Sequence, residues 1–204
     1  MRKRKPCYSK AIVIVHGKCE KQICDYIKSK LRLKMYIESD KKGENPIQIT
    51  SLMNVLNNSK FKSLKNFIRY FEDVEIIKDK RITRLSTDFK IFTIMDTDDC
   101  TSMQKKKYIN KGMFKNHWAY DYIEPIYNSP ELEDVLVKAG IPFKKQGSKR
   151  KSEYIKIFPT NNRYSGSEEV ELNNFCEKLK SIKDTNMDKF IDFCLKKCLD
   201  NKYL

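Results

Sequence analysis

The sequence predicts an α/β fold in which a mainly parallel sheet is flanked by helices. Two apolar runs, at residues 11–15 and 89–95, are rich in β-branched or aromatic side chains and fit strands buried on both faces. Segments with apolar residues at helical spacing alternate with such runs. This alternation favours a layered sheet with right-handed crossovers, whose sites form outside the carboxyl ends of the strands.

The first half of the chain supplies further patterns of both kinds. Residues 18–33 carry apolar side chains at helical spacing. A short apolar run at 47–52 predicts a strand, and the pattern of 53–71 predicts a helix. Residues 74–85 fit either a strand or a helix, so the choice stays open.

The second half predicts one more strand and several helices. Thr101 is placed to cap a helix, and 118–126 predicts a strand that Pro125 interrupts. Ser129-Pro130 opens a further helix, because proline is favoured in a first turn. Helical patterns at 172–179 and 190–199 follow.

Basic residues far outnumber acidic ones. The 204 residues include 42 Lys and Arg against 27 Asp and Glu, which gives a formal net charge of +15. Such a surplus attracts polyanions, and nucleic acid is the usual partner. The basic residues cluster at 2–5, 105–107 and 144–151, and the last cluster indicates an exposed basic loop. A lysine-rich proteome would also produce a basic protein, so charge favours nucleic acid without requiring it.

The seven cysteines show no regular spacing, and no long apolar run follows the basic residues 2–5. We therefore expect a reduced, cytoplasmic protein without a secretory signal. The run at 11–15 is too short to span a membrane, so no membrane partner is expected. Cys194 and Cys198 would share a helix face, yet a structural zinc site normally needs four ligands, and buried thiols are the favoured interpretation.

An acidic run, Asp96-Thr97-Asp98-Asp99, follows the second predicted strand. Asp96 and Asp98 can point the same way, and two clustered carboxylates repel each other unless a cation compensates. Mg²⁺ prefers one or two carboxylates together with water and phosphate oxygens. The alternative is an acidic turn that caps the next helix, a role open to Asp99 or Thr101.

Gly17-Lys18-Cys19-Glu20 follows the first predicted strand. Gly17 permits a tight turn, and Glu20 then lies in the first helical turn, near the strand end. A glutamate there commonly serves only the helix dipole. Together with Asp96 and Asp98, it would complete a three-carboxylate site. His16 precedes this turn, and a neutral histidine at a strand end is more often structural than a ligand.

This combination of strand, Gly-x-x-Glu and helix with a later strand and Asp-x-Asp resembles the Toprim domain of topoisomerases, primases and several nucleases. The resemblance covers roughly residues 10–160 and is strongest to small RloB-type and overcoming-lysogenization-type proteins of bacterial defence. It assigns the motif glutamate to Glu20 and the aspartates to Asp96 and Asp98. A later family segment, Ser-Asn-Pro-x-Phe-Glu, corresponds to Asn128-Ser129-Pro130-Glu131-Leu132-Glu133, which adds Glu133.

The resemblance implies a Toprim-like, Rossmann-like nuclease domain at 1–165 and a C-terminal helical appendage at 166–204. A helical insertion is expected at about 53–88, because this part is longer than a minimal Toprim core. His16 also departs from the family, whose members usually have an acidic or small residue there.

The implied activity is divalent-metal-dependent hydrolysis of phosphodiester bonds in DNA or RNA. Mg²⁺ or Mn²⁺ would be held by Asp96 and Asp98, with Glu20 as ligand or base and Glu133 in support. The backbone of the nucleic acid would be guided by a set of basic residues: Lys144, Lys145, Lys149, Arg150, Lys151 and Lys156. A role as an antiviral effector held by a regulatory protein partner is a further expectation. The alternative is a Toprim-like module that binds nucleic acid without cutting it.

Overall fold

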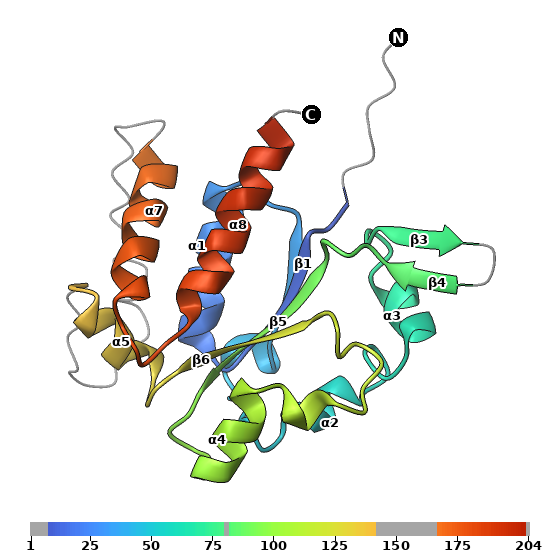
Figure 1. The fold of residues 1–204 in the computed structure, drawn as a ribbon, viewed down its shortest axis with the longest axis horizontal. Helices are drawn as coiled ribbons and strands as arrows, with labels where there is room; N and C mark the ends of the chain where they lie inside the picture. Colours follow the sequence, from blue (N-terminus) through green and yellow to red (C-terminus); the bar gives the residue numbers. More distant parts are fainter. Residues whose placement is uncertain (1–7, 80–81, 142–166, 203–204) are drawn as a thin grey trace.

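The computed structural model describes residues 8–79, 82–141 and 167–202. Within these ranges, a four-stranded sheet has the order β2-β1-β5-β6, and every neighbouring pair of strands is parallel (Figure 1). The strands are β1 (Ala11–Val15), β2 (Met35–Glu38), β5 (Lys90–Asp96) and β6 (Ile123–Asn128). The predicted α/β fold with a mainly parallel sheet flanked by helices is therefore confirmed.

The two central strands are buried on both faces, as their apolar runs predict. Successive side chains of a strand point to opposite faces of the sheet. In β1, Val13 and Val15 join the core on one face, while Ile12 and Ile14 join the core on the other. β5 divides its apolar side chains between the same two cores.

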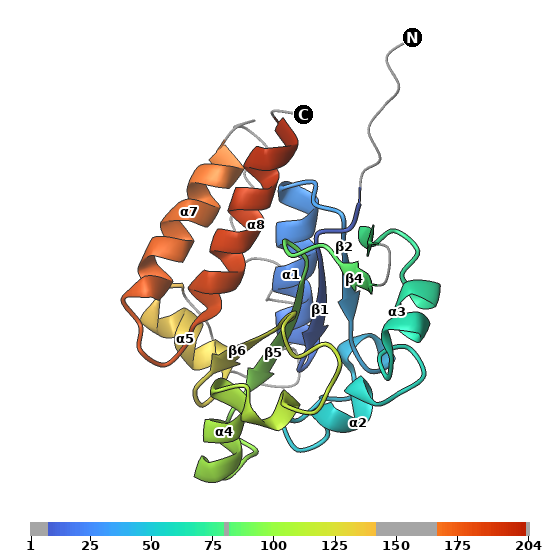
Figure 2. The same ribbon diagram turned by 45° about the vertical axis from the view of Figure 1, so that its right-hand side comes forward.

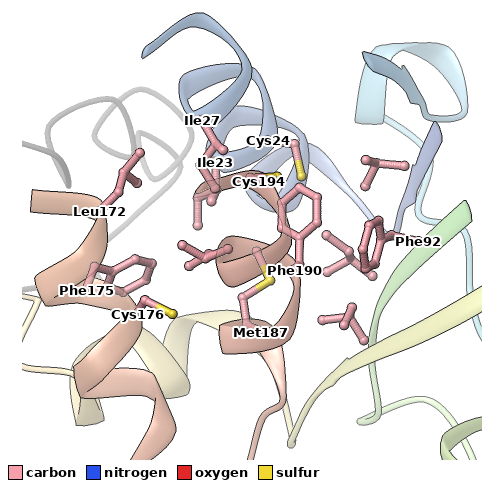
Figure 3. Close-up of a cluster of buried hydrophobic side chains, with 14 of the residues drawn as sticks. Ile23, Cys24, Ile27, Phe92, Leu172, Phe175, Cys176, Met187, Phe190 and Cys194 are labelled. Carbon is pink, nitrogen blue, oxygen red and sulfur yellow. The ribbon is translucent and has the colours of Figure 1, made fainter. Parts of the chain in front are cut away.

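Helices cover both faces of the sheet (Figures 1 and 2). One face carries α1 (Lys18–Lys30), α5 (Leu132–Lys138), α7 (Ser167–Lys180) and α8 (Met187–Lys202). Figure 3 shows Phe190 of α8 beside Phe92 of β5, with ring centroids 5.0 Å apart. Cys194 is buried in this core, and Cys198 is buried on the same helix, as expected from their spacing.

The opposite face carries α2 (Leu52–Leu56), α3 (Leu64–Tyr70), α4 (Ser102–Ile109) and a 3₁₀ turn, η2 (Gly112–Phe114). A second 3₁₀ turn, η1 (Lys41–Gly43), lies against the start of α1. Phe67 of α3 lies at the centre of an aromatic cluster on this face. Its ring contacts Phe61, Phe71, Phe89 and Trp118, with centroid separations of 4.8–5.9 Å.

The structure corrects the predicted strand at 47–52. Ile47 and Ile49 are buried in an irregular segment, so their apolar character reflects core packing rather than sheet pairing. The strand beside β1 is instead β2, which the sequence pattern did not reveal. β2 is an edge strand with a mixed sequence, Met-Tyr-Ile-Glu, and its place depends on backbone pairing with β1.

The helix predicted at 53–71 is divided into α2 and α3. Asn58 accepts hydrogen bonds from the N–H groups of Lys60 and Phe61 through its side chain, which holds a turn between the helices. Ser63 then caps α3 by accepting a hydrogen bond from the Asn66 N–H.

The expectation of a helical insertion at about 53–88 is only half right. Its first part contains α2 and α3, but the second part forms an antiparallel hairpin of β3 (Ile76–Asp79) and β4 (Ile82–Leu85). This hairpin resolves the choice that the sequence left open for 74–85.

The last strand begins later than predicted, at Ile123 rather than at residue 118, because Trp118–Tyr122 form turns. Pro125 is accommodated because β6 is an edge strand, where a missing N–H is tolerated. The loop between α7 and α8 covers this edge. Asn186 donates a hydrogen bond to the Pro125 carbonyl and accepts one from the Tyr127 N–H.

No helix in the described ranges is long and apolar enough to cross a membrane.

Candidate active site

The carboxyl ends of β1 and β5 and the start of α5 enclose a pocket of about 280 Å³. The four acidic residues singled out from the sequence, Glu20, Asp96, Asp98 and Glu133, all line this pocket. They come from three separate parts of the chain, which meet because parallel strands end at the same edge of the sheet.

Glu20 lies in the first turn of α1 and is only 2% exposed. Its Oε2 atom accepts a hydrogen bond of 2.9 Å from the Gly17 N–H. Its Oε1 atom is buried, and no residue in the described ranges forms a hydrogen bond with it. Burial, with the nearby charges of Glu133 and Asp98, raises the pKa of Glu20 to about 7. The folded chain thus holds a carboxylate oxygen that requires a cation or a proton.

Asp96 is the last residue of β5 and is 6% exposed. Its Oδ1 atom accepts hydrogen bonds from the Leu132 N–H, at 3.1 Å, and from Asn128 Nδ2, at 3.3 Å. Burial is the main cause that raises the pKa of Asp96 to about 9, and the charges of Glu20 and Glu133 add to it. Glu20 and Asp96 therefore oppose each other's ionisation unless positive charge enters the pocket.

Asp98 and Asp99 differ in their surroundings. Asp98 is exposed and lines the pocket. Both carboxylate oxygens of Asp99 are buried and have no hydrogen-bond partner in the part of the chain that the structure describes. Burial raises the pKa of Asp99, while nearby His16 lowers it. The helix-capping role falls to Thr101, whose Oγ1 accepts a hydrogen bond from the Gln104 N–H.

Glu133 lies in the first turn of α5 and accepts a hydrogen bond of 3.2 Å from the Cys19 thiol. Cys19 lines the pocket, although sequence reasoning did not select it. The only available signal was its position inside the Gly-x-x-Glu turn.

His16 also lines the pocket, and its Nδ1 atom lies 3.0 Å from the Ile47 carbonyl oxygen. A carbonyl accepts but never donates, so Nδ1 carries the proton in this contact. The ring of His16 thus holds the segment after η1 in place, which is the structural role that the sequence favoured, and it also faces the pocket.

That segment closes one side of the pocket through Gly43 and Pro46. Gly43 has φ = 89°, and a Cβ atom there would stand 2.9 Å from the Lys18 Cα atom. Only glycine combines this backbone conformation with so close an approach to the start of α1. The sequence marked this stretch only as a polar loop.

The donor set fits a hard divalent cation, because carboxylate oxygens dominate it. Within the described residues, no three His, Cys, Asp or Glu side chains are arranged to hold a metal ion. Mg²⁺ and Mn²⁺ need fewer protein ligands than that, because they commonly bind through one or two carboxylates, with water and phosphate oxygens completing the shell. A cation would stabilise Glu20 Oε1 most, because this buried oxygen has no hydrogen-bond partner among the described residues.

The predicted nucleic-acid contacts, Lys144, Lys145, Lys149, Arg150, Lys151 and Lys156, lie outside the described residues. The basic cluster at 2–5 also lies outside the described residues. In the cluster at 105–107, Lys105 is half-buried, and its Nζ atom donates a hydrogen bond of 2.6 Å to Ser129 Oγ, beside the end of β6. Lys106 and Lys107 are exposed.

Comparisons with protein-family models, with curated proteins and with solved structures find no match to this chain. The resemblance to Toprim proteins therefore stays a prediction.

Proposed function

We propose that the protein is a divalent-metal-dependent nuclease that hydrolyses phosphodiester bonds in DNA or RNA. The observation that carries this proposal is the buried Oε1 atom of Glu20, which has no hydrogen-bond partner among the described residues and lies in a pocket shared with Asp96, Asp98 and Glu133. Mutually repelling carboxylates in a buried site lower stability unless they serve a cation, and a metal site at this edge of the sheet suits phosphoryl chemistry.

Each acidic residue has a role that matches its position. Asp96 and Glu20 would hold Mg²⁺ or Mn²⁺, which supplies charge neutralisation and polarises the phosphoryl oxygen when bound. Asp98, exposed at the pocket, would complete the site from the solvent side. Glu20 is alternatively the base that takes a proton from the attacking water as the water oxygen bonds to phosphorus. The P–O bond to the leaving sugar oxygen then breaks, and that oxygen takes up a proton from solvent. Glu133 supports both arrangements through its charge.

Nucleic acid is the substrate class that the charge favours. The net charge of +15 attracts a polyanion, and Lys105 brings an ammonium group to the edge of the sheet where Asp96 lies. Because these contacts release counterions, binding should weaken steeply as salt concentration rises. Both DNA and RNA satisfy these requirements.

The test is cleavage of labelled single- and double-stranded DNA and RNA by the purified full chain with Mn²⁺. Asp98→Asn should abolish cleavage without loss of stability, because Asp98 is exposed. Asp121→Asn is the matched control, since Asp121 is also exposed but precedes β6, at the opposite end of the sheet. Equal cleavage by all three proteins would refute the proposal. Salt-dependent binding without any product would favour the non-cutting module instead.

The proposal extends to a cytoplasmic antiviral effector of bacteria that a partner protein restrains, as the resemblance to defence-linked Toprim proteins implies. Induced expression of the wild-type chain should then arrest bacterial growth, and Glu20→Ala should not. Unaffected growth in both strains would count against an unrestrained toxin.

A further inference from the structure

A chain of buried hydrogen bonds links the loop between α7 and α8 to Asp96. The Met187 N–H donates to Thr185 Oγ1, at 3.0 Å, and the Thr185 hydroxyl donates to Asn128 Oδ1, also at 3.0 Å. Asn128 Nδ2 then donates to Asp96 Oδ1. Asn128 is fully buried, and Thr185 and Asp96 are each 6% exposed. Water therefore has little opportunity to replace these bonds.

The two ends of this chain favour the same orientation of the Asn128 amide. The Met187 N–H donates to one lone pair of Thr185 Oγ1, and the Thr185 hydroxyl directs its single hydrogen at Asn128 Oδ1. At the other end, Asp96 Oδ1 already accepts the Leu132 N–H, so a reversed amide would place its oxygen against another acceptor oxygen. Thr185 thus helps to keep the NH₂ group of Asn128 directed at Asp96.

The result is a carboxylate anchored on one side. Asp96 Oδ1 accepts hydrogen bonds from both Asn128 Nδ2 and the Leu132 N–H. Among the described residues, these two are the hydrogen bonds that the Asp96 side chain accepts. Two donors on one oxygen fix the plane of the carboxylate and leave Oδ2 for a cation. We propose that Thr185 and Asn128 are positioning residues that orient Asp96, so that the C-terminal helices contribute to the site.

This inference rests on the proposed function, and its alternative is a purely structural role for the loop. A substitution at Asn186, one residue after Thr185, distinguishes the positioning role from the structural role. The Asn186 side chain forms hydrogen bonds with the backbone of Pro125 and Tyr127 and holds the edge of β6. Within the described ranges, these bonds do not connect to Asp96. Loss of the Asn186 side chain therefore loosens the same loop without touching the Asp96 carboxylate.

The experiment measures Mn²⁺ affinity and the thermal midpoint of the full chain for the wild type, Thr185→Val, Thr185→Ser and Asn186→Ala. Thr185→Val should weaken Mn²⁺ binding by about 10–100-fold, the usual effect of removing a residue that orients a metal ligand. Thr185→Ser keeps the hydroxyl and should restore binding. Asn186→Ala should lower the thermal midpoint while its affinity stays close to that of the wild type.

Wild-type affinity in Thr185→Val would overturn the inference, and so would an equal loss of affinity in Asn186→Ala. If Thr185→Val does not fold, Asn128→Ala breaks the same chain one step nearer to Asp96, with the same expected loss. Failure of the wild-type chain to bind Mn²⁺ would instead overturn the proposed function, so the two failures are distinguishable.

Discussion

Replacement of Asp96 by asparagine should stabilise the metal-free protein, although it should abolish the proposed activity. The folded structure raises the pKa of Asp96 from 3.8 to about 9, mainly through burial. Between these values the folded chain holds a proton that the unfolded chain releases. Stability therefore falls as pH rises through this window, and Asp96→Asn removes the loss.

The structure also sets the size of the effect. Neutral pH lies about three units above the pKa of an aspartate in the unfolded chain, and each unit corresponds to about 1.4 kcal/mol, which gives a ceiling of about 4 kcal/mol. The Leu132 N–H and Asn128 Nδ2 can bond the asparagine oxygen as they bond Asp96 Oδ1. We expect a gain of about 1–3 kcal/mol at pH 7, or roughly 3–10 °C in the thermal midpoint.

The assay is thermal unfolding in EDTA across pH 5 to 8.5, for the wild type, Asp96→Asn and the exposed control Asp121→Asn. The advantage of Asp96→Asn should grow with pH, whereas the control should follow the wild type. A difference that stays constant with pH, or a less stable Asp96→Asn, would show that burial of the Asp96 carboxyl does not lower the stability of the folded chain.

Three further perturbations test the site and the core. Mn²⁺ at one hundred times its dissociation constant should raise the unfolding free energy of the wild type by about 2.7 kcal/mol, and that of Asp96→Asn by much less. A thermal-shift assay measures both effects, and equal shifts in the two proteins would show that the ion binds elsewhere. Gly43→Ala should cost about 2–3 kcal/mol in urea unfolding, because the new Cβ atom would meet backbone at 2.9 Å. Gly140→Ala, with φ = 73° and open space, should cost only about 1 kcal/mol, and equal costs would contradict the steric argument. Phe67→Ala should cost about 3–5 kcal/mol in the same assay without changing Mn²⁺ affinity, and a cost below about 1 kcal/mol would contradict its central place in the aromatic cluster.

The sequence by itself determined the central architecture. The apolar runs of β1 and β5 are local signals, because a strand buried on both faces needs apolar side chains at successive positions. The helical spacing that follows β1 likewise identified α1. Once both strands are parallel neighbours, Glu20 and Asp96 must lie at one edge, so the acidic residues of the site were predictable from motif and topology together.

Local patterns misled where burial had another cause. Ile47 and Ile49 are apolar because they fill the core from an irregular segment, while the mixed sequence of β2 forms a strand because β1 offers an unpaired edge. Apolar periodicity reports which side chains avoid water, but not which backbone groups pair.

Only the tertiary structure decided how the site is supported. Gly43 meets the start of α1 across the fold, Cys19 meets Glu133, and Thr185 reaches Asp96 through Asn128. These pairs are far apart in the chain, and their side chains follow no repeating pattern. Their contacts follow from how the packed layers bring distant segments together, whereas the strands and helices themselves follow from local burial and spacing.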